Sequence, residues 1–115
     1  MLGASPKPDR YAHRAMEMLR EYGHRVIPVN PAFPEILGEK CYGSIAEVPE
    51  QIDTITVYLG KARSDPLIGA IVAARPRRLI LNPGAENEDL SSNAEESGIE
   101  VFEECTLVML QSGTF

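Results

Sequence analysis

The 115-residue sequence is poor in cysteine and histidine, with two residues of each. Two cysteines cannot form the disulfide framework that holds small secreted proteins together. The four residues also lack the close spacing of zinc ligands, so we predict no metal site. No stretch approaches the roughly 18 apolar residues of a membrane span, and the first residues lack the charged and then apolar layout of a signal peptide. The sequence therefore predicts a cytoplasmic location.

Basic residues are absent from the last third of the chain. All eleven lie within residues 1–78 beside nine acidic residues, whereas residues 79–115 carry eight acidic residues, which gives the net charge of −6. An acidic protein repels nucleic acid and anionic membranes, and no basic stripe interleaved with aromatic residues is present. We therefore expect neither as a partner. A small anionic ligand on the N-terminal half fits the charge distribution, and a protein partner or a homodimer stays open.

Strand-like and helix-like segments alternate along the chain. Apolar residues at three- and four-residue spacing, together with turn and capping signals, predict helices at 9–22, 64–74 and 86–97, the second of them starting at Ser64-Asp65-Pro66. Short apolar runs predict strands at 24–29, 52–59, 78–82 and 99–102, followed by a tail. This alternation favours a single α/β domain over residues 1–115. We expect a Rossmann-like, doubly wound parallel sheet of about five strands with helices on both faces.

In such folds ligands bind beyond the carboxyl ends of the strands, which directs attention to the N-terminal loop. Gly3-Ala4-Ser5 stands before the first helix, where backbone N–H groups and the Ser5 hydroxyl could hold an anion. The positive charges of Lys7 and Arg10 suit a diphosphate at this place. An ordinary strand-to-helix turn with Ser5 as the helix cap explains the same residues equally well.

The loop is not a dinucleotide fingerprint. G-x-G-x-x-G would need glycines at positions 5 and 8, which are Ser5 and Pro8. The second predicted strand also ends in Asn30 and Pro31, without an acidic residue for a ribose hydroxyl. A Walker-type loop is excluded because no G-K-[ST] occurs. These observations disfavour an NAD enzyme and a P-loop protein.

Four motifs in order carry a resemblance to a known family. They are Gly-Ala-Ser-Pro-Lys-Pro at 3–8, Val-Ile-Pro-Val-Asn-Pro at 26–31, Gly-Ser-Ile-Ala-Glu-Val-Pro at 43–49, and Asn-Pro-Gly at 82–84 with Glu88. With them the sequence resembles the small stand-alone CoA-binding domain proteins, which are similar to the N-terminal CoA-binding domain of the succinyl-CoA synthetase alpha subunit. The likeness covers nearly the whole chain.

The resemblance implies that coenzyme A, or an acyl-CoA, lies across the carboxyl edge of the sheet. It places the diphosphate on the loop of residues 3–5, the adenosine end near Asn30 and Pro31, and the pantetheine beyond the third and fourth strands. It implies no ligase activity, because the phosphohistidine of the synthetase belongs to a domain absent here. With the basic residues added, the predicted binding residues are Gly3, Ala4, Ser5, Lys7, Arg10, Asn30, Pro31, Tyr58, Leu59, Pro83 and Gly84.

The first strand departs from the family pattern, because only Met1 and Leu2 precede Gly3. In the strand order 3-2-1-4-5 this strand is central, and its loss leaves ladder groups on both neighbours unpaired. Such orphaned groups cost about 1–3 kcal/mol each. We therefore expect that the chain is an abbreviated version of a longer protein, or that another segment or another chain fills the gap.

Cys105 is the one residue that suggests chemistry. It follows the last predicted strand, where a thiol could react with the thiol of bound CoA, but the adjacent Glu103 and Glu104 disfavour the thiolate form. We expect an inert thiol. His13 and His24 have no Ser or Cys partner at a recognisable spacing, so we expect structural roles on a helix surface and a strand edge. The leading function is a CoA-binding module without chemistry. A thiol-dependent enzyme or redox protein using Cys105, and a protein-interaction domain that has lost its ligand, remain as alternatives.

Overall fold

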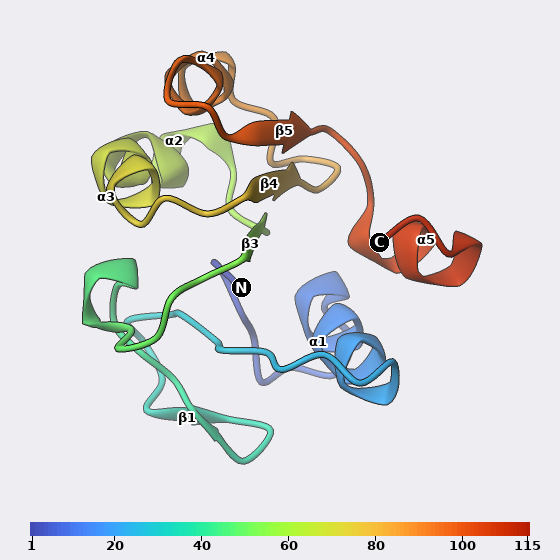
Figure 1. Cartoon of the computed structure of the whole chain (residues 1–115). Coiled ribbons are helices and arrows are strands. Elements are labelled where there is room, and N and C mark those ends of the chain that lie inside the picture. The colour runs from blue at the N-terminus through green and yellow to red at the C-terminus, as the bar shows by residue number, and fades with distance from the viewer.

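A parallel three-stranded sheet forms the centre of the computed structural model, which describes residues 1–115. Its strands are β3 (Thr54–Val57), β4 (Arg78–Leu81) and β5 (Glu100–Phe102), in the order β3-β4-β5. All four residues of β4 are buried, because helices cover both faces of the central strand (Figure 1). The prediction of a Rossmann-like α/β fold is confirmed, whereas the predicted count of about five strands is not.

The N-terminal residues extend this sheet as a very short segment. Leu2 forms parallel bridges with both Val29 and Val57. Its N–H donates to the Thr56 carbonyl oxygen at 2.9 Å, and its own carbonyl accepts from the Tyr58 N–H at 2.9 Å. The N-terminal segment therefore occupies the central position that the strand order predicts.

The strand predicted at 24–29 is wrong, since only Val29 makes bridges. Pro28 has no N–H to donate, and the neighbouring N-terminal segment ends at Met1, so no ladder can form along residues 24–27. On the outer side of Val29 the neighbour is Tyr42, not the strand predicted at 52–59. That strand, β3, lies on the other side of Leu2.

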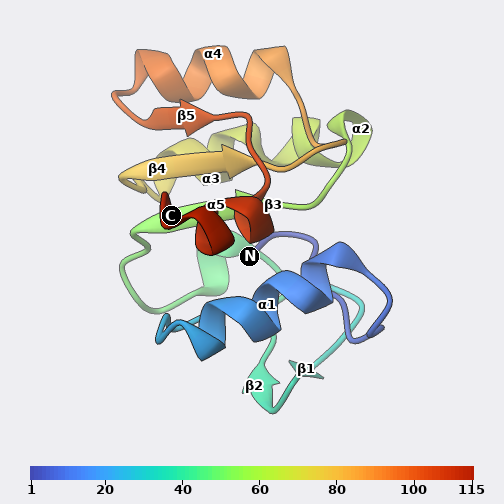
Figure 2. The same cartoon turned by 90° about the vertical axis from the view of Figure 1, so that its right-hand side faces the viewer.

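Helices pack on the two faces of the sheet (Figure 2). On one face, α1 (Tyr11–Glu21) and α5 (Thr106–Ser112) bury an apolar cluster that includes Met16, Leu19 and Leu110. On the other face, a cluster including Ile71, Leu79 and Leu90 lies under the remaining helices. These are η1 (Ile45–Glu47), α2 (Lys61–Ser64), η2 (Asp65–Leu67), α3 (Ile68–Ala73) and α4 (Glu88–Glu96). The prediction of helices on both faces is confirmed.

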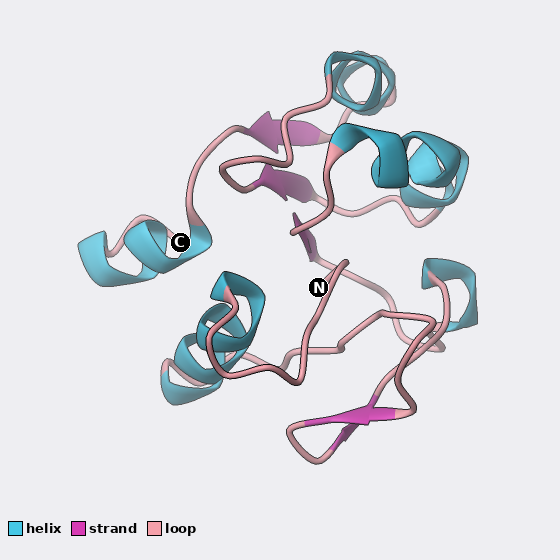
Figure 3. Cartoon of the chain, turned by 180° about the vertical axis from the view of Figure 1, so that it is seen from behind, coloured by secondary structure: helices cyan, strands magenta, loops and turns pink.

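Two local predictions are corrected. The second helical region begins at Lys61 with Gly60 as its N-cap, so Ser64 lies inside it and does not cap it. The tail after β5 forms α5, because Thr106, Met109 and Leu110 are spaced to bury one helical face. Between α1 and β3 the chain is mostly loop, apart from the short helix η1 and a hairpin of β1 (Glu35–Ile36) and β2 (Glu39–Lys40) (Figure 3).

The amino group of Met1 is buried at the end of the short central segment. It donates a hydrogen bond to the Ile27 carbonyl oxygen at 2.9 Å. Burial lowers its pKa from the ordinary 8.0 to about 5. Beyond this group, a cavity of about 260 Å³ lies between residues 24–27 and residues 52–56.

The buried amine makes stability depend on pH. Between pH 5 and pH 8 the unfolded chain binds the proton that the folded chain has released, so the free energy of unfolding should rise with pH in this window. The rise should reach up to about 4 kcal/mol, and it should end above pH 8, where both states are uncharged. Urea unfolding at several pH values, of the chain and of its Nα-acetylated form, measures this rise in the free energy of unfolding. The acetylated form should lack this slope, and equal slopes in both would contradict the assignment.

Candidate functional site

The side chain of Asn30 joins two loops, the one after the N-terminal segment and the one after Val29. Its Nδ2 donates to the carbonyl oxygen of Ala4 at 2.8 Å, and its Oδ1 accepts from the N–H of Ala32 at 2.9 Å. Both loops lie at the carboxyl ends of parallel segments, where this fold class binds ligands. Asn30 therefore shapes the edge of the site, and its amide is already used within the protein.

Gly3 brings the N-terminal loop against the end of β3. Its φ is +80°, and a Cβ added to it would lie 2.8 Å from the Tyr58 carbonyl oxygen and 2.9 Å from Leu59 Cδ2. No other residue fits this position, because both the backbone conformation and the close approach require a missing side chain. The loop after β3 in turn meets the loop after β4, since a Cβ on Gly60 would lie 4.0 Å from the Gly84 carbonyl oxygen.

The predicted binding residues thus fall into two groups. One group forms a continuous row along the carboxyl edge of the sheet: Asn30, Ala4, Gly3, Tyr58, Leu59 and Gly84. The others stand on the exposed or half-buried parts of the same loops: Ser5, Lys7, Arg10, Pro31 and Pro83. The structure brings the predicted segments to one edge, although they come from four different parts of the chain.

Ser5 does not cap α1. Its hydroxyl oxygen accepts from the N–H of Lys7 at 3.1 Å, and α1 begins only at Tyr11, with Arg10 as N-cap and no side-chain cap. The reason is local, because Ser5 and Lys7 each precede a proline and are therefore disfavoured in the helical conformation. The helix-cap interpretation of Ser5 is wrong, and the loop is separated from the helix by a turn.

The same turn leaves donors for an anion. The N–H groups of Ala4 and Ser5 make no hydrogen bond within the chain, and neither Lys7 nor Arg10 makes an ion pair. Free backbone N–H groups beside unpaired cations are the donor set that phosphate groups prefer. The residues present therefore fit the phosphates of a CoA molecule.

His13 holds this turn in place from α1. It is buried, which corrects its predicted position on the helix surface, and its Nδ1 lies 3.0 Å from the Ser5 carbonyl oxygen. His24 is exposed and its ring packs edge-on against Phe115, with ring centroids 4.8 Å apart. Both histidines therefore make structural contacts.

A buried polar network fixes the ends of β3 and β4 to the start of α5. Asn82 Nδ2 donates to Thr56 Oγ1 at 2.7 Å and to the Val57 carbonyl oxygen at 2.9 Å, while its Oδ1 accepts from the Thr106 N–H at 2.8 Å. The hydroxyls of Thr56 and Thr106 bond each other at 2.8 Å. The sequence analysis named Asn82 only as part of the Asn-Pro-Gly motif and missed Thr106, whose signal was the helical spacing of the tail.

Tyr58 and Cys105 lie beside this network at the carboxyl edge. The Tyr58 hydroxyl is buried without a hydrogen-bond partner, because the threonine hydroxyls near it bond each other. Burial raises the pKa of Tyr58 to about 12, and the neighbouring Cys105 adds to the rise. Tyr58 is therefore a neutral phenol at physiological pH, and its hydroxyl is closed off from solvent.

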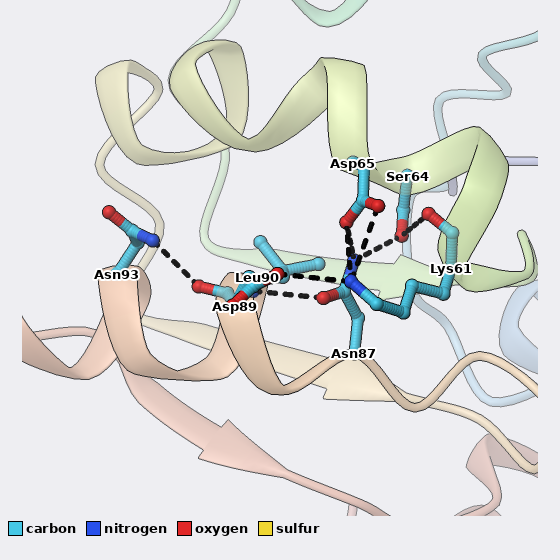
Figure 4. Close-up of polar contacts among 7 residues, drawn as sticks. All are labelled: Lys61, Ser64, Asp65, Asn87, Asp89, Leu90 and Asn93. Carbon is cyan, nitrogen blue, oxygen red and sulfur yellow. Dashed lines mark hydrogen bonds and ion pairs between the residues drawn. The ribbon is translucent and has the colours of Figure 1, made fainter.

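A second set of polar contacts joins α2 to the start of α4 (Figure 4). Asn87 caps α4 by accepting from the Leu90 N–H at 3.1 Å, and its Nδ2 donates to Ser64 Oγ and Asp65 Oδ1. Lys61 bridges Asp89 and Asp65, at 3.0 and 3.1 Å. Lys61 is thereby committed to carboxylates, so the unpaired cations near the N-terminal loop are Lys7 and Arg10.

A comparison with known protein families shows to which family this chain belongs. The profile of the family described as CoA binding domain matches residues 1–111. The chain belongs to this family. The resemblance seen in the sequence motifs is thereby confirmed at the level of the family.

Its relatives include longer proteins. The chain is 36% identical over 69 residues to the protein YneT of Bacillus subtilis, a match covering 60% of this chain and 49% of that protein. It is 40% identical over 59 residues to an ADP-forming acetate–CoA ligase of Archaeoglobus fulgidus, covering 51% of this chain and 9% of the ligase. One crystal structure of an uncharacterized protein superimposes with a TM-score of 0.93 at 42% identity, over 99% of this chain and 93% of that one. The chain therefore spans at most about half the length of these curated relatives.

Two further observations on this domain concern membrane-spanning helices and metal sites. None of its helices has the length and apolar character needed to cross a membrane. No group of three or more His, Cys, Asp and Glu side chains is arranged to hold a metal ion.

The Gly3→Ala substitution tests the close approach at the site. It should lower the free energy of unfolding by about 2–4 kcal/mol, because the new Cβ meets the Tyr58 carbonyl oxygen in a backbone conformation that alanine disfavours. The matched control is Gly38→Ala, with a φ of +77° and open space around the added Cβ, which should cost about 1 kcal/mol. Urea unfolding measures both. Equal losses of free energy in the two variants would show that the close contact with Tyr58 does not affect stability.

Proposed function

We propose that this domain binds coenzyme A or an acyl-CoA along the carboxyl edge of its sheet and performs no bond-making chemistry of its own. The observation that carries the proposal is the continuous row from Asn30 through Gly3 to Tyr58 and Gly84, in a chain of the CoA binding domain family. The proposal treats residues 1–115 as a single domain that acts in the cytoplasm, with a small molecule as its first partner.

The diphosphate of CoA would lie on the loop of residues 3–5. The unpaired N–H of the half-buried Ser5 supplies a directional donor, and the exposed Lys7 and Arg10 supply charge. Since both cations are exposed, their attraction to phosphate should weaken as salt is added.

The two ends of CoA would follow the row in opposite directions. The adenosine end would approach Pro31, while Asn30 acts through Ala4 by orienting the phosphate loop. The pantetheine arm would pass Tyr58, Leu59, Pro83 and Gly84. Gly84 has open space where a side chain would stand, which leaves room for this arm.

Calorimetric titration with CoA tests the phosphate loop. The chain should bind CoA with a micromolar Kd, and Lys7→Gln should weaken binding about tenfold at low salt, because one charge-assisted contact is lost. Lys40→Gln is the matched control, since Lys40 is an exposed lysine in the hairpin and should leave the Kd unchanged. NAD and 3′-dephospho-CoA should bind more weakly than CoA. Absence of binding by all three ligands would favour a protein-interaction domain that has lost its ligand.

A thiol reaction is the second candidate function, supported by the position of Cys105 beside Tyr58 at the same edge. The Cys105 thiolate would attack the disulfide of oxidised CoA, form a mixed disulfide and release one CoA thiolate, so that atoms and electrons balance. The Cys105→Ser variant separates the two candidates. We expect it to keep the Kd for CoA, and we expect intact-mass spectra of the unmodified chain with oxidised CoA to show no stoichiometric adduct. An adduct that Cys105→Ser abolishes would establish the thiol reaction instead.

A further inference from the structure

A buried asparagine connects the end of α2 with the start of α4 beside the candidate site. Asn87 is 2% exposed, and its amide makes three hydrogen bonds (Figure 4). Its Nδ2 donates to Ser64 Oγ at 2.8 Å and to Asp65 Oδ1 at 2.9 Å, while its Oδ1 accepts from the Leu90 N–H at 3.1 Å. Ser64 is itself fully buried. The amide of Asn87 is therefore used within the protein, and its role is the connection between the two helical segments.

The contacts of Asn87 join the two segments that follow the loops of the candidate site. α2 begins at Lys61, directly after Gly60, and Asn87 stands three residues after Gly84. The two loops meet at these glycines, since a Cβ added to Gly60 would lie 4.0 Å from the Gly84 carbonyl oxygen. Asn87 therefore fixes the distance between the two loops on their helix side.

A second buried asparagine holds the loop after β4 on its sheet side. Asn82 donates to the Val57 carbonyl oxygen at 2.9 Å, at the end of β3. Between the two asparagines, Ala85 is buried and its N–H donates to the Asn82 carbonyl oxygen at 2.8 Å. The loop of residues 83–86 is therefore fixed at both ends and in its middle.

The two fixed loops present free backbone groups. The carbonyl oxygens of the exposed Pro83 and Gly84 accept no hydrogen bond within the chain, and the N–H of the exposed Gly60 donates none. The pantetheine arm of CoA contains two amides, each of which carries one donor and one acceptor. A hydrogen bond needs a donor–acceptor distance of about 2.7–3.2 Å, so the affinity for the arm depends on loops that already stand at the right separation.

We propose that Asn87 is a positioning residue for the pantetheine arm, an inference that rests on the proposed CoA function. It acts without touching the ligand, because it holds the end of α2 against α4 and thereby keeps Gly60 and Gly84 at one separation. The loop of residues 3–5 is held by Asn30 and stands outside these contacts. Asn87 should therefore control the affinity for the arm and not the affinity for the phosphates.

The ion pairs of Lys61 support the same connection more weakly. Lys61 Nζ lies 3.1 Å from Asp65 Oδ1 and 3.0 Å from Asp89 Oδ2. All three side chains are exposed, and exposed ion pairs are screened by water and salt. The amide of Asn87, which is shielded from water, is therefore the contact that decides the separation of the loops.

The Asn87→Asp variant tests this contact with little change in shape. Aspartate caps a helix as well as asparagine does, so the start of α4 is kept. The variant loses the amide donor and sets a second carboxylate against that of Asp65, so the two helical segments should move apart. Asn87→Ser is a second variant, because serine also caps a helix, adds no charge and is too short to reach α2.

Calorimetric titration of the full chain compares two ligands. One is CoA, and the other is adenosine 3′-phosphate 5′-diphosphate, which is CoA without the pantetheine arm. Both variants should bind CoA about tenfold more weakly and should bind the nucleotide within about twofold of the unmodified chain. Asn93→Asp is the matched control, because it adds the same charge to α4 but its amide bonds only the Asp89 carbonyl oxygen of its own helix. It should change neither Kd.

Restoring the contact completes the test. Combining Asn87→Asp with Asp65→Asn exchanges the two groups, so that an amide again donates to a carboxylate between the two helical segments. This double variant should bind CoA as the unmodified chain does. Equal losses for CoA and the nucleotide, an unchanged Kd for CoA in both single variants, or no recovery in the double variant would overturn the role of Asn87 and leave the proposed function standing. No binding of CoA to the unmodified chain would overturn both.

Discussion

The insertion of Met1, Leu2 and Gly3 between two other segments is the constraint on which the architecture depends. Backbone hydrogen bonds of this segment reach Ile27 and Val29 on one side and Thr56 and Tyr58 on the other. Three residues thereby connect the loop-rich half of the molecule with the regular sheet. The same segment leads into the loop of residues 3–5 at its carboxyl end, so the candidate site inherits its geometry from one short piece of chain.

The candidate CoA site depends on groups that bind other parts of the protein, not on a set of reactive side chains. Asn30 holds the loop through Ala4, Gly3 permits contact with Tyr58, and Asn82 fixes the strand ends to α5. What is left free is a small set of groups: a backbone N–H and two exposed cations. Rigid amides thus hold the loops on which these free groups stand.

Much of the fold could be predicted from the sequence, because alternating apolar runs and helical spacing are local signals. The family likeness and the edge at which the binding segments meet followed from motifs in order. Other features were not local. Whether Ser5 caps a helix depends on the two prolines after it, and whether residues 24–29 form a ladder depends on how far the neighbouring segment reaches. The burial of His13 and the partner of Thr106 required the packing of elements far apart in the chain.

The central position of Met1, Leu2 and Gly3 also bears on how the protein folds. Both of the pairing partners of this segment come later in the chain, the second at Thr56–Tyr58. Parallel pairing over such a sequence separation is slow to form, because a long loop must close first. The middle of the sheet is therefore among the last parts of the molecule to reach its final position.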